Sequence, residues 1–244
     1  GPLPEKVDLL FMAEGYRQEE QTLFEKDVHH LCEALWKMPP FTSLRKDFNV
    51  RAIFVPSSDS GPDEPSQGRY RATAFNSTYD TFEIDRYLTT FDTFALRHAA
   101  AQAPCDHLVL LVNSRRYGGG GFYNHLTLVT ARNTLSEKVF SHELGHGLAG
   151  LGDEYYTSSV SYENFYPAGV EPWEPNLTTL TRFETKWKDM VPGGRPVPTP
   201  REKPFANSIG VFEGGGYTSR GVYSPFQDCR MKSNQAEGFC PVCQ

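Results

Sequence analysis

The stretch His107-Leu108-Val109-Leu110-Leu111-Val112 decides the fold class, because it is an unbroken apolar run bounded by polar residues. A short run of this kind is typical of a strand that is buried on both faces. Residues 7–12 and 48–55 form two similar apolar segments earlier in the chain. The sequence therefore predicts three buried strands, of which 107–112 is the third.

Helices are predicted between these strands. Residues 19–38 and 82–103 carry apolar side chains at helical spacing, and prolines end both segments. Downstream, four glycines at 118–121 precede residues 122–130, which alternate like an edge strand. Thr134-Leu-Ser-Glu137 fits a capping box and opens a predicted helix that runs to about residue 149.

The alternation of strand and helix over residues 1–150 indicates the α/β class. We predict a mixed, mostly parallel sheet with an antiparallel edge strand and with helices packed on it. After residue 150 the periodicity becomes weak and the chain is rich in proline and aromatic residues. We therefore expect residues 1–244 to form a single domain with a subdomain 1–150 and a loop-rich subdomain 151–244.

Composition limits the classes of function. Hydrophobic residues make up 39% and charged residues 22% of the chain, as in globular proteins. The net charge of −6 argues against a nucleic-acid binder, which should be basic. No apolar run approaches the roughly 18 residues of a membrane span. We expect a soluble, monomeric domain with no nucleic-acid partner and no membrane span.

The segment Ser141-His142-Glu143-Leu144-Gly145-His146 carries the strongest chemical signal. Two histidines four apart share a helix face, with Cβ atoms about 5–6 Å apart, so both can reach one Zn²⁺. Glu143 would then lie beside the metal, where a general base for a water belongs. The competing interpretation is a chance pair of histidines. Gly145 and Gly147 argue against it, since each weakens a helix by up to about 1 kcal/mol and suggests close approach of other segments.

A catalytic Zn²⁺ takes three protein ligands and keeps one position open. The segment after the helix, Gly150-Leu-Gly152-Asp153-Glu154, can turn back through a left-handed glycine. Asp153 is the first candidate for the third ligand and Glu154 is the alternative. Both carboxylates could also be solvated loop charges.

These segments resemble the bacterial IgA-peptidase family of zinc metallopeptidases. The blocks that carry the resemblance are residues 142–155, the glycine-rich loop 116–124, and residues 171–176, 211–217 and 221–225. The resemblance implies a metzincin-like catalytic domain with one catalytic Zn²⁺ and a methionine-containing turn under the metal. The chain departs from the usual HExxHxxGxxD spacing, because Gly150 and Asp153 each come one residue later.

The implied activity is hydrolysis of peptide bonds in a protein or peptide substrate, with Glu143 as general base. Met231 fits the methionine turn, although it could be an ordinary core methionine. Tyr223 is the first candidate for stabilising the oxyanion, ahead of Tyr217 and Tyr155. An extended substrate could pair with the edge strand, where we place its contacts on Gly119, Gly120, Phe122 and Tyr123.

Three of the five cysteines, Cys229, Cys240 and Cys243, lie within the last sixteen residues. A disulfide from Cys229 to one of the other two would staple the turn in an oxidising compartment. A second zinc site needs four ligands, and only three cysteines are close together in the sequence, which argues against such a site. The family and the clustered cysteines imply a secreted, periplasmic or cell-surface location. No targeting segment is recognisable, and Gly1-Pro2-Leu3 is typical of an expression remnant, so we expect an excised domain.

Two other classes of function remain open from the sequence. One is a different zinc hydrolase, such as an amidase or a deacetylase, because HExxH does not name the bond that is cleaved. The other is a non-catalytic protein-binding domain on the same scaffold. These residues determine neither the natural substrate nor whether immunoglobulin is cleaved.

Overall fold

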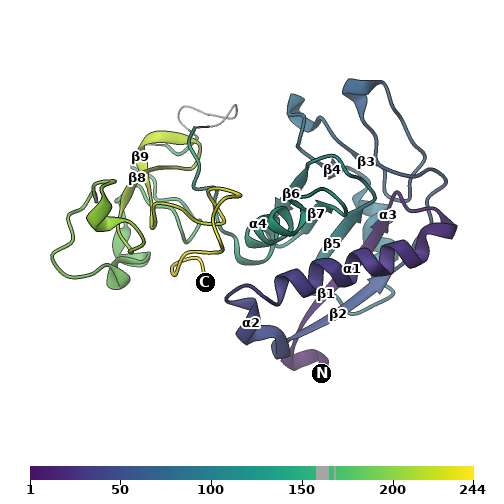
Figure 1. The fold of residues 1–244 in the computed structure, drawn as a ribbon, viewed down its shortest axis with the longest axis horizontal. Coiled ribbons are helices and arrows are strands. Elements are labelled where there is room, and N and C mark those ends of the chain that lie inside the picture. Colours follow the sequence, from purple (N-terminus) through teal and green to yellow (C-terminus); the bar gives the residue numbers. More distant parts are fainter. Residues whose placement is uncertain (158–164, 168) are drawn as a thin grey trace. The chain divides into compact units, whose positions relative to one another are not determined.

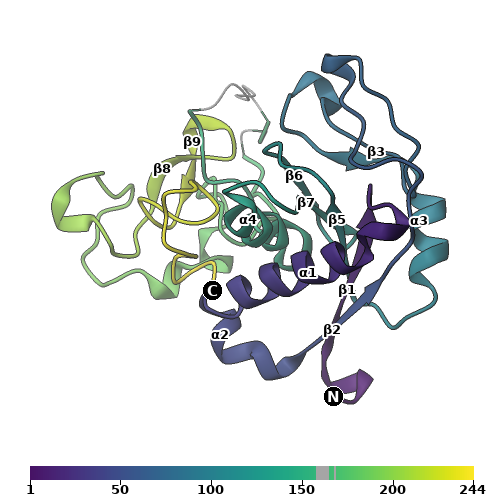
Figure 2. The ribbon, with the colours of Figure 1, turned by 45° about the vertical axis from the view of Figure 1, so that its right-hand side comes forward.

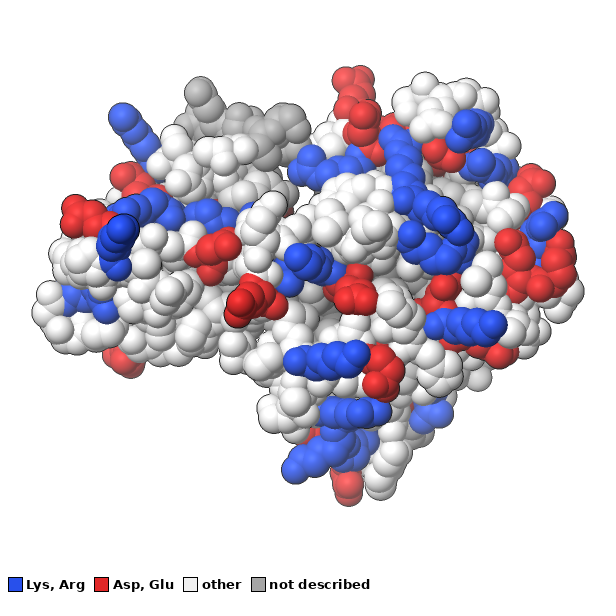
Figure 3. Space-filling view, viewed as in Figure 1, with Lys and Arg blue, Asp and Glu red and all other residues white. Residues whose placement is uncertain are grey.

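The computed structural model describes residues 1–157, 165–167 and 169–244. Its contacts divide the chain into two compact units, Gly1–Ala149 and Gly150–Gln244, drawn in Figure 1. Within the described residues, no helix has both the length and the apolar character needed to cross a membrane. Figure 3 shows acidic and basic side chains interspersed on one face.

A five-stranded sheet forms the centre of the first unit and confirms the predicted mixed, mostly parallel sheet. The strand order is β2-β1-β5-β7-β6, and only the edge strand β6 runs antiparallel to its neighbour. All six residues of β5 are buried, as the apolar run predicts. The strands are β1 (Val7–Glu14), β2 (Phe48–Ile53), β5 (His107–Val112), β6 (Gly119–Phe122) and β7 (Leu126–Thr130).

Helices cover both faces of this sheet. They are α1 (Gln21–Leu35), α2 (Phe41–Leu44), α3 (Thr93–Ala100) and α4 (Ser136–Ala149). Leu96 of α3 packs on the face that carries Leu10 and Leu110. On the opposite face Phe140 of α4 contacts Phe11, with ring centroids 5.7 Å apart. The helices α1 and α4 lie side by side in Figures 1 and 2 and contact each other.

Smaller elements complete both units. The first unit holds the two-residue strands β3 (Ser77–Thr78) and β4 (Thr89–Thr90), and the second holds the hairpin β8 (Phe212–Gly215) and β9 (Thr218–Ser224). Single 3₁₀ turns span Leu3–Glu5, Gln18–Glu20, Arg45–Asp47, Pro65–Gln67, Thr81–Glu83, Phe183–Thr185, Lys188–Met190 and Lys203–Phe205. The second unit is loop-rich and packs around an apolar cluster of Phe183, Trp187 and Val211.

The predicted helix over residues 82–103 is wrong in its first half. The helix α3 begins only at Thr93, where the Asp92 carboxylate accepts a hydrogen bond from the Ala95 N–H (3.1 Å). Phe82 has a φ of 56°, which no helix interior allows. The apolar stripe was misleading because Phe91 and Phe94 are 74% and 84% exposed and pack on no core.

The predicted edge strand over residues 122–130 is also wrong. It is two strands, β6 and β7, joined by a turn in which the His125 N–H donates to the Phe122 carbonyl (3.0 Å). The strand β7 is buried between β5 and β6, and the edge of the sheet is formed by the glycines. Alternation suggested one solvent face, but the buried Thr127 hydroxyl is satisfied by the His107 ring (2.9 Å).

The helix α4 lies so close to β6 and β7 that three positions have no room for a side chain. A Cβ atom added to Gly147 would lie 2.5 Å from the Thr127 Oγ1 atom. One added to Gly121 would lie 2.6 Å from the His146 Cβ atom, and one added to Gly119 2.9 Å from the Glu143 Cγ atom. The strand β6, called the glycine strand because it contains Gly119, Gly120 and Gly121, therefore helps to set the position of the helix that carries the candidate metal ligands.

This packing predicts the effect of Gly147→Ala. In an open helix position alanine would stabilise the fold by up to about 1 kcal/mol. Here the added methyl group meets Thr127 and His107, so we expect a destabilisation of about 1–3 kcal/mol. Urea denaturation measures the free energy of unfolding. Gly193→Ala is the control, because a Cβ there meets nothing within 4 Å, and equal stability of the two variants would contradict the packing argument.

Candidate metal centre

The two predicted histidine ligands lie together on α4. The Nε2 atoms of His142 and His146 are 3.1 Å apart, and their rings are nearly perpendicular, at 88°. A tetrahedral Zn²⁺ with bonds of about 2.0–2.1 Å holds two nitrogens about 3.3–3.4 Å apart. The spacing of the two nitrogens therefore fits joint ligation of one metal ion without any change of the helix.

Glu143 is held on the same helix by the glycine strand. Its carbonyl accepts a hydrogen bond from the Thr127 hydroxyl (3.3 Å). Its side chain lies against Gly119, where an added Cβ would come within 3.0 Å of the Glu143 Oε1 atom. The position of the predicted general base thus depends on the absence of a side chain at Gly119.

The predicted substrate contacts all fall on β6 or on the turn that follows it. The Gly119 carbonyl accepts a hydrogen bond from the Leu88 N–H (3.2 Å). A Cβ on Gly120 would lie 2.6 Å from the Leu88 carbonyl oxygen. The start of this edge is therefore already paired by the protein's own chain, and no local pattern in the sequence indicates this pairing. Tyr123 is 53% exposed at the other end.

Asp153 lies in the second unit and is held in place by two tyrosines. The hydroxyl groups of Tyr155 and Tyr217 donate to its Oδ2 atom, at 3.0 and 2.5 Å. Its carbonyl accepts from the Gly216 N–H (2.8 Å), and the side chain is only 6% exposed. Asp153 is therefore not a solvated loop charge.

Glu154 has hydrogen-bond partners different from those of its neighbour Asp153. Its carboxylate is fully buried, and its Oε1 atom accepts hydrogen bonds from Asn176 (3.0 Å) and from the Cys243 thiol (3.2 Å). Burial raises the pKa of Glu154 well above its usual value. The sequence does not predict the contact between the Cys243 thiol and Glu154, because the two residues lie far apart in the chain.

Tyr223 and Met231 occupy different surroundings in the second unit. Tyr223 packs against the cluster of Phe183, Trp187 and Val211, and its pKa is raised by burial. Met231 is fully buried in a turn that is closed by a hydrogen bond from the Lys232 N–H to the Cys229 carbonyl (2.8 Å). Of the three candidate tyrosines, the two that the sequence placed second, Tyr155 and Tyr217, are those in contact with Asp153.

Comparison with known proteins gives one result. The family model of IgA Peptidase M64 matches residues 1–205 and 201–244. None of the curated proteins matches the chain. The family match covers the sheet, the histidine pair of α4 and the whole second unit, and it favours a peptidase over an amidase, a deacetylase or a binding domain. The chain therefore belongs to the IgA peptidase M64 family and is a metallopeptidase, a hydrolase that acts on protein substrates.

Proposed function

We propose that this metallopeptidase is a zinc-dependent endopeptidase whose metal ligands are His142, His146 and Asp153. The observation that carries the proposal is the 3.1 Å separation of the two histidine Nε2 atoms. Two imidazoles and one carboxylate form a ligand set that suits Zn²⁺ and leaves one position open. Asp153 is chosen over Glu154 because the Glu154 carboxylate is already engaged by Asn176 and Cys243.

Bound zinc would supply Lewis acidity, which lowers the pKa of a water and polarises the scissile carbonyl. Glu143 removes a proton from the attacking water and delivers it to the leaving nitrogen. Tyr155 and Tyr217 orient the Asp153 carboxylate through its Oδ2 atom, as residues around a metal site commonly do for its ligands. Met231 would supply the turn beneath the metal, and Tyr223 remains the proposed donor to the oxyanion.

We further propose that an extended peptide pairs with β6 beyond Gly120. Leu88 already pairs with Gly119 at the start of this edge, and the Phe122 carbonyl accepts the hydrogen bond from His125. Gly121 is therefore the residue whose backbone offers strand pairing. Tyr123 would then contact a substrate side chain at the exposed end of the strand.

Glu143→Gln tests the general base. The amide cannot accept the proton, so we expect kcat on a peptide library to fall by about 10²–10⁴-fold. The zinc content, measured by elemental analysis, should stay unchanged. Glu137→Gln on the same helix is the matched control, because the Glu137 side chain is 52% exposed and pairs with His30 at the surface. Retention of full activity by Glu143→Gln would refute the proposed mechanism.

Two tyrosine variants separate ligand positioning from oxyanion stabilisation. Tyr217→Phe removes a hydrogen bond to Asp153, so we expect zinc affinity to weaken by about 10–100-fold. Tyr223→Phe should leave zinc affinity unchanged and lower kcat by about 10²–10³-fold at saturating zinc. Chelator competition measures the affinity, and cleavage of a peptide measures kcat. Unchanged kcat in Tyr223→Phe would remove that residue from the mechanism.

A further inference from the structure

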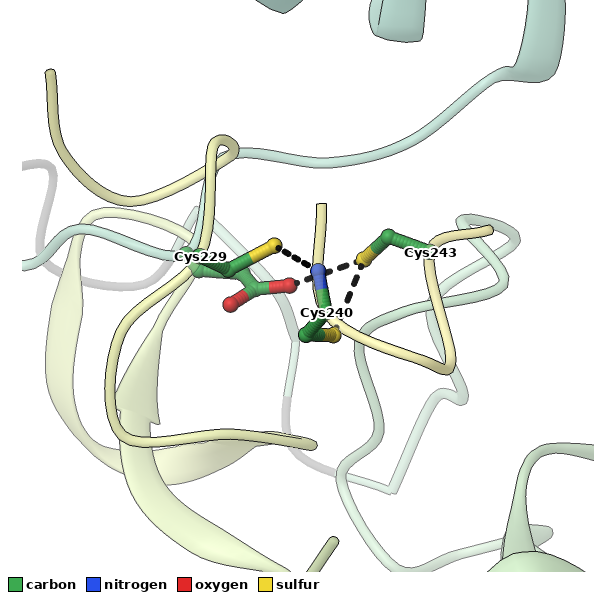
Figure 4. Close-up of side chains that lie close together, drawn as sticks. Cys229, Cys240 and Cys243 are labelled. Carbon is green, nitrogen blue, oxygen red and sulfur yellow. Dashed lines mark hydrogen bonds between the residues drawn. The ribbon is translucent and has the colours of Figure 1, made fainter. Parts of the chain in front are cut away.

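Three thiols and one carboxylate converge inside the unit Gly150–Gln244. They belong to Cys229, Cys240, Cys243 and Glu154, and one ligand atom from each lies within 4.8 Å of all the others. The four side chains are at most 9% exposed. Figure 4 shows the three cysteine side chains pointing toward one another. The histidine pair of α4 contributes nothing to this cluster.

Two distances in the cluster are close to those of a tetrahedral zinc site. The Cys240 and Cys243 sulfurs are 3.6 Å apart, and the Cys243 sulfur is 3.2 Å from the Glu154 Oε1 atom. A tetrahedral Zn²⁺ with Zn–S bonds of about 2.3 Å and a Zn–O bond of about 2.0 Å places two sulfurs about 3.8 Å apart and a sulfur and an oxygen about 3.5 Å apart. Small movements of the side chains would bring all four groups to this geometry.

The backbone around the cysteines is arranged to support thiolates. Cys240 and Cys243 flank a turn closed by a hydrogen bond from the Cys243 N–H to the Cys240 carbonyl (2.9 Å). The Cys240 N–H donates to the Cys229 sulfur at 3.1 Å.

The Glu154 carboxylate has an incomplete set of partners. Its Oε1 atom accepts hydrogen bonds, but its Oε2 atom is buried and has no hydrogen-bond partner within the described part of the chain. Burying a carboxylate without compensation is costly, so a fully buried one needs a cation or a proton. A metal ion held by the neighbouring thiolates would supply that compensation.

We propose that Cys229, Cys240, Cys243 and Glu154 bind a second Zn²⁺, with a structural role. Three sulfurs and one oxygen close a tetrahedral site and leave no open position for a substrate. Thiolate ligands select Zn²⁺ over Mg²⁺ and Ca²⁺. The three cysteines alone are one ligand short of such a site, and Glu154, a carboxylate from far upstream, is the fourth. This proposal does not rest on the proposed peptidase mechanism.

A disulfide explains the cluster less well. All five cysteines are free in this structure, and the odd number of clustered thiols would leave one of them over. A disulfide would also leave the buried Oε2 atom of Glu154 without a hydrogen-bond partner among the described residues. The mass of the unreduced chain distinguishes the two explanations, because each disulfide lowers this mass by two hydrogens.

The metal content of a variant without the histidine site tests the proposal. In His142→Ala/His146→Ala, purified with Zn²⁺ present, we expect one zinc per chain by elemental analysis. X-ray absorption at the zinc edge should then give mostly sulfur neighbours at about 2.3 Å. A chain without zinc, zinc with only nitrogen and oxygen neighbours, or a mass two hydrogens lower would each overturn the proposal.

Adding Cys243→Ser to the same background should remove the remaining zinc. Cys105→Ser is the matched control, because Cys105 is partly exposed in the first unit, outside the cluster, and should leave one zinc bound. Retention of zinc by the Cys243→Ser protein would contradict the ligand assignment. The absorption measurement on the background variant decides the question even if Cys243→Ser fails to fold. Failure of the peptidase mechanism would appear only in the cleavage assays.

Discussion

The close approach of α4 to the glycine strand is the constraint on which the rest of the candidate site depends. A helix normally rests on a sheet through side chains, and the layer of side chains keeps the two backbones apart. Here glycines thin that layer. Gly121 faces the backbone carbonyl of Glu143, and Gly119 faces the Glu143 side chain. On the helix, Gly147 faces the side chains of Thr127 and His107. The sheet then holds in place the part of α4 that carries His142, Glu143 and His146. The helix accepts Gly147 in its interior because the close packing that this glycine allows compensates for its low helix propensity.

In the second unit, backbone hydrogen bonds hold residues 153–155 in place. Asp153 and Tyr155 receive backbone hydrogen bonds from Gly216 and Tyr217, while the Glu154 N–H donates to the Met231 carbonyl (2.8 Å). One carboxylate lies among tyrosine hydroxyls and the other among thiols, so two adjacent acidic residues have unrelated environments. Their sequence alone offers no means of telling them apart.

The sequence predicted the parts of the fold that local patterns determine. The buried run 107–112, the first helix and the helix with His142 and His146 were all recognisable, because burial and helical spacing are visible within a few residues. Residues 82–92 were misassigned because Phe91, which looks like part of an apolar helix face, is exposed to solvent. Residues 122–130 were misassigned because Thr127 is buried and its hydroxyl is hydrogen-bonded to His107, which no local pattern indicates. The pairing of Glu154 with the cysteines could not be predicted either. It depends on how loops without periodicity fold back on one another.

The glycine strand also determines what a redesign of this enzyme could change. A strand made of glycine offers backbone amide groups and no side chains, so under the proposed strand pairing it would contact the main chain of a bound peptide but not its side chains. Any larger residue at Gly119 would displace the Glu143 side chain before it could contact a ligand. Selectivity for particular sequences therefore has to be engineered at the ends of the strand, where Tyr123 is exposed, and not along the strand itself.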